Sequence, residues 1–233
     1  MNKLGICLGK GRLAPKSYKV FAECGYPCDD IERELTATGK LSQNQYEGKR
    51  ATFFVHKADG LLAAVEKGTK AAIGIVGEDS KLEYEFRTKR GTGFTSFRVS
   101  DVFEFPKMKF VIAGRPENEE EFFKRLAQKK FLEIVTSYPA ITQEYFAQKY
   151  PDFQQIFLDL IYSTGETELL AGGLDLAIAA FELVETGKSL VKNGLIPYAC
   201  PTQEIPVLGI VNNGAAAYNS EVRDLAERVQ EGI

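Results

Sequence analysis

Short apolar runs alternate with amphipathic stretches along almost the whole chain. This pattern is typical of strands that alternate with helices in α/β proteins. Glycines that follow several of the amphipathic stretches match C-terminal helix caps. The pattern predicts strands at residues 3–9, 51–55, 71–77, 131–137, 153–162, 176–184 and 205–212, and helices at residues 14–25, 59–68, 117–130, 140–150 and 220–230.

Residues 82–113 have a different character, because they are rich in Phe, Val and Thr around a Gly-centred turn. We expect antiparallel strands here. A basic stretch within this segment allows two interpretations: a solvated β-hairpin, which we favour, or a surface that grips nucleic acid or an acidic partner. Its basic and aromatic residues are Arg87, Lys89, Arg90, Arg98, Phe86, Phe94 and Phe97.

The composition narrows the range of functions. The chain has 233 residues, of which 44% are hydrophobic and 26% charged, and a net charge of -3, so a generalised nucleic-acid or membrane surface is not expected. The first residues lack the apolar run of a secretory signal or a membrane span, which predicts a cytoplasmic protein with free thiols. His56 is the one histidine, so any chemistry depends on carboxylates, Lys, Arg, hydroxyls and backbone amides.

The apolar run at residues 176–184 ends abruptly at Glu-Thr-Gly. Periodicity alone allows a helix or a strand, but a parallel strand buried on both faces explains the missing polar alternation. The chain then reads strand, turn, helix, and free amides at such a junction bind phosphate. A Thr-Gly turn after a strand is also common without any ligand.

The side chains around this turn suit a phosphorylated sugar. Gly187 lets the backbone approach closely, while Thr186 and Ser189 offer hydroxyl donors and Lys188 adds charge. Carboxylates lie just upstream, at Glu182 and Glu185, where they could hold ribose hydroxyls or a magnesium ion that rides on the phosphates.

The segment 182–195 resembles the phosphoribosyl-pyrophosphate segment of the ATP phosphoribosyltransferases, the first enzymes of histidine biosynthesis. Other stretches match that family in order along nearly the whole chain. They are residues 10–13, 74–79, 111–114, 134–147, 165–168 and 208–229.

The resemblance implies an α/β, two-domain, periplasmic-binding-protein-like (type II) fold with the ligand cleft between the domains. Domain I would comprise residues 1–113 and 196–233, and domain II residues 114–195. The length implies the short form of the enzyme, which depends on a histidyl-tRNA-synthetase-like regulatory subunit in a homo- or hetero-oligomer. Neither a nucleic acid nor a membrane is expected among the partners.

The reaction implied by the resemblance joins N1 of the adenine of ATP to C1 of phosphoribosyl pyrophosphate, with Mg²⁺ on the pyrophosphate leaving group. The implied catalytic residues are Lys10, Arg12, Glu168 and Glu182. The implied substrate-binding residues are Gly11, Gly74, Gly77, Asp79, Glu185, Thr186, Gly187, Lys188, Ser189 and Leu190, and no residue is assigned as a metal ligand. Two stretches have plainer interpretations: residues 10–12 as a solvated turn, and residues 74–77 as a core strand with its turn.

The chain also departs from the family pattern. The family acid before the phosphoribosyl strand becomes Ile178, or slides to Asp175, and a second family acid falls on Ala72. A family arginine falls near His56, and Gly9 replaces a proline. Loss of a ribose carboxylate would lower activity sharply, so the alternative is a non-catalytic nucleotide- or phosphoribosyl-binding regulatory paralogue.

Overall fold

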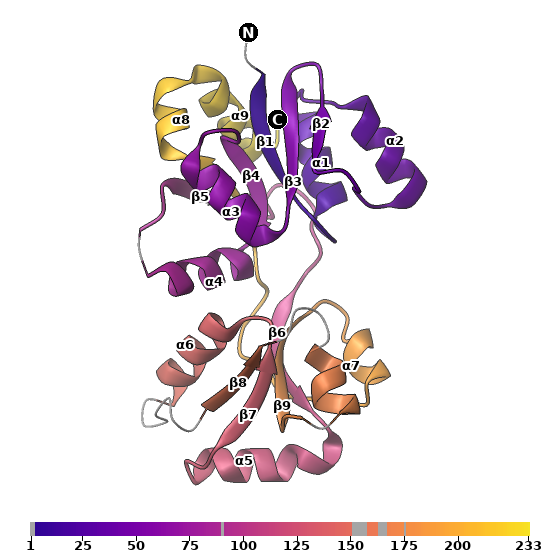
Figure 1. Cartoon of the computed structure of the whole chain (residues 1–233), viewed down its shortest axis with the longest axis vertical. Helices are drawn as coiled ribbons and strands as arrows, with labels where there is room; N and C mark the ends of the chain where they lie inside the picture. The colour runs from indigo at the N-terminus through magenta and orange to yellow at the C-terminus, as the bar shows by residue number, and fades with distance from the viewer. Residues whose placement is uncertain (1–2, 90, 151–157, 163–166, 175) are drawn as a thin grey trace. The chain divides into compact units, whose positions relative to one another are not determined.

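The computed structural model describes residues 3–89, 91–150, 158–162, 167–174 and 176–233. The chain divides into two compact units, Met1–Pro106 with Pro206–Ile233, and Lys107–Ile205. Each unit is built on one mixed sheet flanked by helices (Figure 1). The predicted two-domain α/β fold class is therefore confirmed. The unit boundaries differ from those expected after residues 113 and 195, because β6 and β10 pair with each other in the second sheet.

The first unit contains a six-stranded sheet in the order β2-β3-β1-β4-β11-β5. Strand β1 runs parallel to both of its neighbours, β3 and β4, whereas β11 runs antiparallel to β4 and β5. The carboxyl ends of β1, β3 and β4 therefore meet at one edge of the sheet. The strands are β1 (Leu4–Gly9), β2 (Gln45–Glu47), β3 (Ala51–His56), β4 (Ile73–Gly77), β5 (Phe94–Arg98) and β11 (Val207–Asn212).

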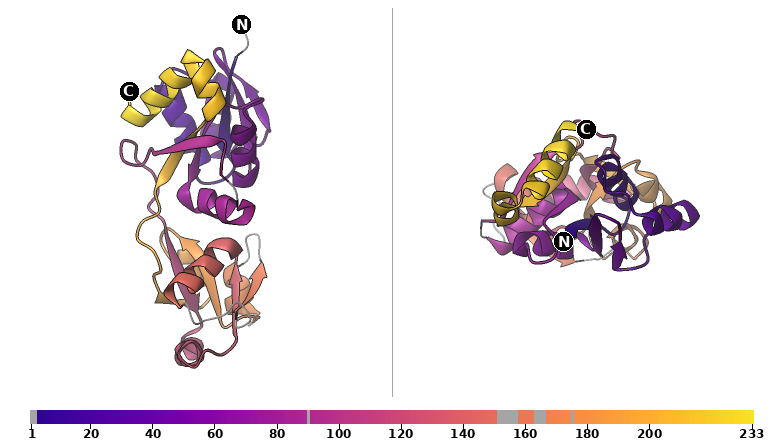
Figure 2. Two further views of the ribbon diagram at one scale, coloured as in Figure 1. Left: turned by 90° about the vertical axis from the view of Figure 1, so that its left-hand side faces the viewer. Right: turned by 90° about the horizontal axis from the view of Figure 1, so that it is seen from above.

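Helices cover both faces of this sheet. Alternate residues of β1 point to opposite faces: Leu4, Ile6 and Leu8 pack in the core beneath α1, α2 and α9, and Cys7 packs in the core beneath α3 and α4. The C-terminal helices α8 and α9 pack together beside β11 (Figure 2). The helices are α1 (Ala14–Glu23), α2 (Asp29–Thr38), α3 (Ala58–Lys67), α4 (Glu78–Thr88), α8 (Asn213–Tyr218) and α9 (Ser220–Glu231).

The second unit contains a five-stranded sheet in the order β10-β6-β9-β7-β8. Strand β7 runs parallel to β8 and β9, and β6 runs antiparallel to β9 and β10. The elements are β6 (Lys109–Gly114), η1 (Pro116–Asn118), α5 (Glu119–Ala127), β7 (Leu132–Thr136), α6 (Pro139–Lys149), β8 (Leu158–Tyr162), η3 (Leu169–Gly173), β9 (Ala179–Val184), α7 (Lys188–Lys192) and β10 (Ile196–Ala199).

Strand β9 lies in the middle of this sheet and is buried on both faces. Ala180 and Val184 pack in a cluster with Leu190 of α7, and Phe181 stacks between Phe110 and the ring of Tyr145. Burial on both faces explains why residues 176–184 lack polar alternation, and the strand expected there is confirmed at Ala179–Val184.

The expectation of antiparallel strands throughout residues 82–113 is wrong. Residues 78–88 form α4, which begins with Glu78 and Asp79 in its first turn, where carboxylates oppose the positive end of the helix dipole. The favoured β-hairpin at residues 86–98 is also absent. Its first residues end α4, and Arg87 is held by an ion pair with Asp59 at 2.9 Å. Strands β5 and β6 do exist, but they belong to different sheets.

Among the described residues, the short elements α2, β2, η3, α8 and β10 were not predicted. Helix α2 carries three acids in its first turn and buries fully only Ile31, so few apolar residues mark it in the sequence. The strand expected at residues 153–162 is described as β8 from residue 158 onward, and residues 153–157 lie outside the described part of the chain.

Candidate active site

The carboxyl ends of β7, β8 and β9 meet at one edge of the second sheet, because these three strands are parallel. The turn Glu185–Gly187 follows β9 at this edge and leads into α7. Loops at the carboxyl ends of parallel strands are the usual place for ligands in α/β proteins. The sequence-predicted phosphate segment therefore lies at the edge of the sheet where ligands are expected.

The backbone of this turn requires glycine at one position. Gly187 is the N-cap of α7 and has φ 72°, in the left-handed region, and a Cβ at this position would meet no atom within 4 Å. Backbone conformation, rather than space, selects glycine here. Leu190 is buried and packs α7 against the core of the second unit, which holds the preceding turn in place.

The polar residues of the turn face solvent. Glu185, Thr186, Lys188 and Ser189 are exposed. Helix α7 has five residues, so its dipole is short and the local attraction for an anion comes from main-chain amides, the two hydroxyls and the ammonium group of Lys188. This arrangement can accept a phosphate group without a deep cavity.

Two half-buried carboxylates lie near the same edge. The last parallel pair between β7 and β9 is Thr136 with Phe181, so the next residues, Ser137 and Glu182, are level with each other. The Glu182 carboxylate accepts a hydrogen bond from the Leu183 amide at 2.9 Å.

Glu168 lies near this edge because the preceding residue, Thr167, contacts Ser137. The hydroxyl of Thr167 is 3.1 Å from the hydroxyl of Ser137, and Thr167 is fully buried. Because Glu168 follows Thr167 directly, the structure brings both sequence-predicted acids, Glu168 and Glu182, to the end of β7.

A set of hydroxyl-bearing residues after β7 was not assigned from the sequence. Thr136 accepts a hydrogen bond from the amide of Tyr138 at 2.9 Å, and Thr142 donates to the carbonyl of Tyr138 at 2.7 Å. The Tyr138 ring lies edge-on to Phe110, with ring centroids 5.0 Å apart. The signal available in the sequence was Thr-Ser-Tyr after a strand and directly before a proline that begins a helix.

The first unit has a comparable edge at the ends of β1, β3 and β4. Lys10 follows β1, and its amide donates to the carbonyl of His56 at the end of β3, at 2.7 Å. Gly11 has φ 103° and is exposed, so the turn again depends on glycine. Lys10 and Arg12 are exposed on either side of it. A basic turn at a sheet edge is thus in place.

The glycines of β4 have different roles. Gly77 ends the strand, and a Cβ there would lie 2.0 Å from a carboxylate oxygen of Asp79, so glycine allows the buried Asp79 to fold back over the backbone. Gly74 lies inside the strand, where a Cβ would meet the carbonyl of Cys7 at 3.0 Å and Leu61 at 3.1 Å. Gly74 therefore serves the packing of α3, and its plainer interpretation as part of a core strand fits the structure.

Cys7 offers no nucleophile beside this edge. The side chain is buried, and burial raises the pKa of the Cys7 thiol to about 12. A thiol with such a pKa is protonated at neutral pH and unreactive.

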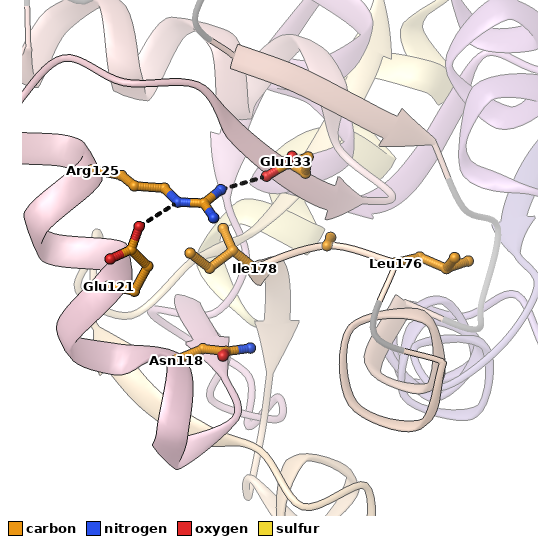
Figure 3. Close-up of a pocket in the computed structure, with 7 residues that line it drawn as sticks. Asn118, Glu121, Arg125, Glu133, Leu176 and Ile178 are labelled. Carbon is orange, nitrogen blue, oxygen red and sulfur yellow. Dashed lines mark hydrogen bonds and ion pairs between the residues drawn. The ribbon is translucent and has the colours of Figure 1, made fainter.

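A pocket of about 260 Å³ lies at the opposite edge of the second sheet. Arg125 of α5 donates hydrogen bonds to Glu121 at 2.9 Å and to Glu133 at 3.1 Å (Figure 3). The hydrogen bond from Arg125 lowers the pKa of Glu121. Because two carboxylates already surround this guanidinium, the pocket does not suit a phosphate. Its lining is Asn118, Glu121, Arg125, Glu133, Leu176, Ala177 and Ile178.

Comparison with known proteins identifies the family. A family model described as "HisG: ATP phosphoribosyltransferase" matches residues 57–231. The ATP phosphoribosyltransferase of Lachnospira eligens is 32% identical over 203 residues, which cover 86% of this chain and 84% of that protein. The chain belongs to the ATP phosphoribosyltransferase family. The ATP phosphoribosyltransferase of Clostridium acetobutylicum is 31% identical over 232 residues, which cover 98% of this chain and 94% of that protein.

Solved structures show the same fold. The chain resembles a chain of the ATP phosphoribosyl transferase (HisG:HisZ) complex from Thermotoga maritima, with a TM-score of 0.70, 22% identity, and coverage of 98% of this chain and 96% of that one. The periplasmic aliphatic sulphonate binding protein SsuA from Escherichia coli has a TM-score of 0.55 at 11% identity, over 98% of this chain and 73% of that one. The expected periplasmic-binding-protein-like fold is therefore confirmed.

The two positions at which a family acid is expected to be replaced, Ile178 and Ala72, lie at the opposite ends of their strands from the candidate ligand edges. Ile178 precedes the first residue of β9, roughly 23 Å along the strand from Glu185 at about 3.3 Å per residue. Ala72 precedes β4 and lies roughly 16 Å from Gly77. The alternative position Asp175 lies outside the described residues. The loss of a ribose carboxylate at residue 178 stays a prediction; in the structure this residue lies directly before the start of β9.

Within the described ranges, no helix has both the length and the apolar character needed to cross a membrane.

Proposed function

We propose that this chain is the catalytic subunit of an ATP phosphoribosyltransferase, a glycosyltransferase that joins N1 of ATP to C1 of phosphoribosyl pyrophosphate and releases pyrophosphate in the first step of histidine biosynthesis. Membership of the family supports this function. The observation that carries it is the glycine-dependent turn Glu185–Gly187, which lies beside Glu182 at the carboxyl ends of the parallel strands β7, β8 and β9.

In this proposal, the second unit binds phosphoribosyl pyrophosphate. The 5′-phosphate lies on the main-chain amides of residues 186–189, with the hydroxyls of Thr186 and Ser189 and the ammonium group of Lys188 around it. Leu190 holds α7 in place from the core. Glu182 and Glu168 accept hydrogen bonds from the ribose hydroxyls. Glu182 is level with the end of β7, and Glu168 follows Thr167, whose hydroxyl is hydrogen-bonded to Ser137 directly after β7.

Magnesium suits this site as an ion bound together with the substrate phosphates. Among the described residues, no set of three His, Cys, Asp or Glu side chains gathers to hold a metal by itself. Mg²⁺ in nucleotide enzymes is usually bound by one or two carboxylates together with substrate phosphates, and Glu182 and Glu185 are placed to supply them. When bound, the ion neutralises the charge that develops on the pyrophosphate.

The first unit binds ATP in this proposal. Lys10, the Gly11 amide and Arg12 lie on an exposed turn and hold phosphate groups, while Gly77 and Asp79 line the adenine side. Gly74 supports the strand from behind rather than touching the ligand.

The chemistry requires little of the protein beyond position and charge. N1 of adenine attacks with its own lone pair, so no strong base is needed before the bond forms. The amides of residues 186–189 and Lys188 hold phosphoribosyl pyrophosphate by its 5′-phosphate, and Lys10 and Arg12 hold the phosphates of ATP, so each substrate is kept in a fixed orientation. A chain with one histidine suits this mechanism.

A regulatory subunit belongs to the proposed assembly. The Thermotoga maritima structure is described as a HisG:HisZ complex, and this chain matches one of its chains over 98% of its own length. We expect a histidyl-tRNA-synthetase-like subunit to complete the enzyme in the cytoplasm. The alternative is a non-catalytic nucleotide- or phosphoribosyl-binding regulatory paralogue, which the altered acids at Ile178 and Ala72 motivate. Binding of both substrates without release of pyrophosphate would favour it.

Thermal unfolding with phosphoribosyl pyrophosphate and Mg²⁺ tests this function. A ligand at about 100 times its dissociation constant adds about 2.7 kcal/mol, so the midpoint of wild-type unfolding should rise by several degrees. A variant carrying Thr186→Val and Ser189→Ala should lose most of that rise but keep its midpoint without ligand, because both side chains are exposed. No rise at millimolar ligand, with the regulatory subunit present, contradicts the proposal.

A further inference from the structure

The loop between α2 and β2 has a conformation that one carboxylate fixes. Glu34 accepts a hydrogen bond from the amide of Ser42 at 2.8 Å and another from the hydroxyl of Tyr46. The amide of Gln43 donates to the same Tyr46 hydroxyl at 3.1 Å. Tyr46 is buried, so the loop is tied to the body of the first unit.

This loop carries Asn44 to the ligand edge of the first sheet. The carbonyl of Asn44 accepts a hydrogen bond from the Val55 amide at 2.9 Å, one residue before the end of β3. The side-chain oxygen of Asn44 then accepts a hydrogen bond from the ammonium group of Lys10 at 2.8 Å. Since the Lys10 amide is bound to the His56 carbonyl, both ends of this lysine are held.

A neutral amide is well suited to this contact. A lysine ammonium is a point charge on a flexible four-carbon stem, so an exposed lysine loses affinity for a phosphate through the entropy of ordering that stem. An amide oxygen orders the stem and leaves the positive charge intact. A carboxylate in the same place would also order it, but would offset the charge that the phosphate needs.

We propose that Asn44 is a positioning residue that holds the Lys10 ammonium at the sheet edge, ready for a phosphate of the ligand of the first unit. The inference rests on the proposed function, which assigns that ligand as ATP. Glu34 and Tyr46 act one step further away, because they set the loop that delivers Asn44.

Steady-state kinetics of the complete enzyme with its regulatory subunit tests the inference. Asn44→Ala should raise the KM for ATP roughly three- to tenfold, as expected for the loss of one solvent-exposed hydrogen bond, with kcat within about twofold. Asn44→Asp should raise the same KM further, and its effect should shrink at high salt, which screens the new charge. The KM for phosphoribosyl pyrophosphate should not change in either variant.

Gln45→Ala is the matched control. Gln45 is also exposed, and its amide donates to Glu47 at 2.8 Å instead of to Lys10. Its KM for ATP should equal that of the wild type. In a double-mutant cycle, Asn44→Ala should add nothing to Lys10→Ala, because the amide then has no ammonium to hold.

Calorimetric titration with inorganic tripolyphosphate separates this inference from the proposed function, because it needs no turnover. Weaker binding in Asn44→Ala than in Gln45→Ala supports the positioning role even if the wild type fails to use ATP, a failure that would count against the proposed function alone. Equal tripolyphosphate affinity in the wild type and Asn44→Ala, or additive effects of Asn44→Ala and Lys10→Ala, overturns the inference.

Discussion

Thr167 and Ser137 share a hydrogen bond between their hydroxyl oxygens, which are 3.1 Å apart. Thr167 is fully buried, so water cannot replace its partner. The bond links the segment that carries Glu168 to the end of β7, beside Glu182 on the neighbouring strand. The position of Glu168 relative to Glu182 therefore depends on a contact between residues that have no charge.

Removal of this hydroxyl pair should affect substrate binding. Ser137→Ala leaves the buried Thr167 hydroxyl without that partner, which costs about 1 kcal/mol of unfolding free energy and loosens Glu168. We expect a severalfold higher KM for phosphoribosyl pyrophosphate. Ser100→Ala is the control, because Ser100 accepts a hydrogen bond from the Val207 amide at 3.2 Å in the first unit. An unchanged KM in Ser137→Ala would contradict the link to Glu168.

Gly187→Ala should separate backbone strain from ligand binding. An alanine at φ 72° costs about 1 to 2 kcal/mol, and any relaxation moves the amides that are proposed to hold phosphate. Gly39→Ala introduces similar strain, because Gly39 has φ 67° and also has open space around it. Both variants should lose similar stability in denaturant unfolding. Loss of phosphoribosyl pyrophosphate affinity should be confined to Gly187→Ala, and equal affinity in both would argue against the phosphate turn.

Restoration of the family acid should not increase activity. Ile178→Asp places a carboxylate at a position that is 8% exposed, near Glu121 and Glu133. Burial should lower the unfolding free energy by roughly 1 to 3 kcal/mol, because Arg125 in the same pocket is already hydrogen-bonded to Glu121 and Glu133. Well below the unfolding midpoint, kcat should equal that of the control Ile178→Val. A higher kcat in Ile178→Asp would show that residue 178 does act in the reaction.

The loop that carries Asn44 should make stability sensitive to acid. Hydrogen bonds from Ser42 and Tyr46 lower the pKa of Glu34. The carboxylate therefore contributes stability above the ordinary pKa of a glutamate, and this contribution is lost as the pH falls through the lower pKa of the folded state. Glu34→Gln should flatten the decline of stability in acid, whereas Glu104→Gln, at an exposed position, should leave it unchanged. Parallel declines in all three proteins would contradict this role.

The parts of the fold that could be predicted from the sequence are those with strong local signals. Strands β1, β4, β9 and β11 are long apolar runs, and α9 combines amphipathic spacing with a glycine cap. Strands were predicted in place of helix α4 because its Phe and Tyr residues favour strands. The signal for a helix is the pair of acids, Glu78 and Asp79, in its first turn. Strand β10 has four residues and depends on its pairing with β6.

The candidate site shows the same division. The turn at Gly187 could be predicted from local sequence alone, because a glycine separates a strand from a helix there. Asn44 and Thr167 could not be predicted as partners of Lys10 and Ser137, because each contact joins residues about 30 positions apart and depends on the order of strands in the sheet. Gly74 was assigned to ligand binding through the family resemblance, whereas the contacts that a Cβ would make there, with the carbonyl of Cys7 and with Leu61, depend on the fold.

Release of pyrophosphate tests the central claim most directly. The chain, assembled with its regulatory subunit, is mixed with ATP, phosphoribosyl pyrophosphate and Mg²⁺, and pyrophosphate is measured over time beside a Gly187→Ala control. We expect release that requires both substrates in the wild type and falls sharply in the variant. Binding of both substrates without release would contradict it and would favour a non-catalytic role for this chain.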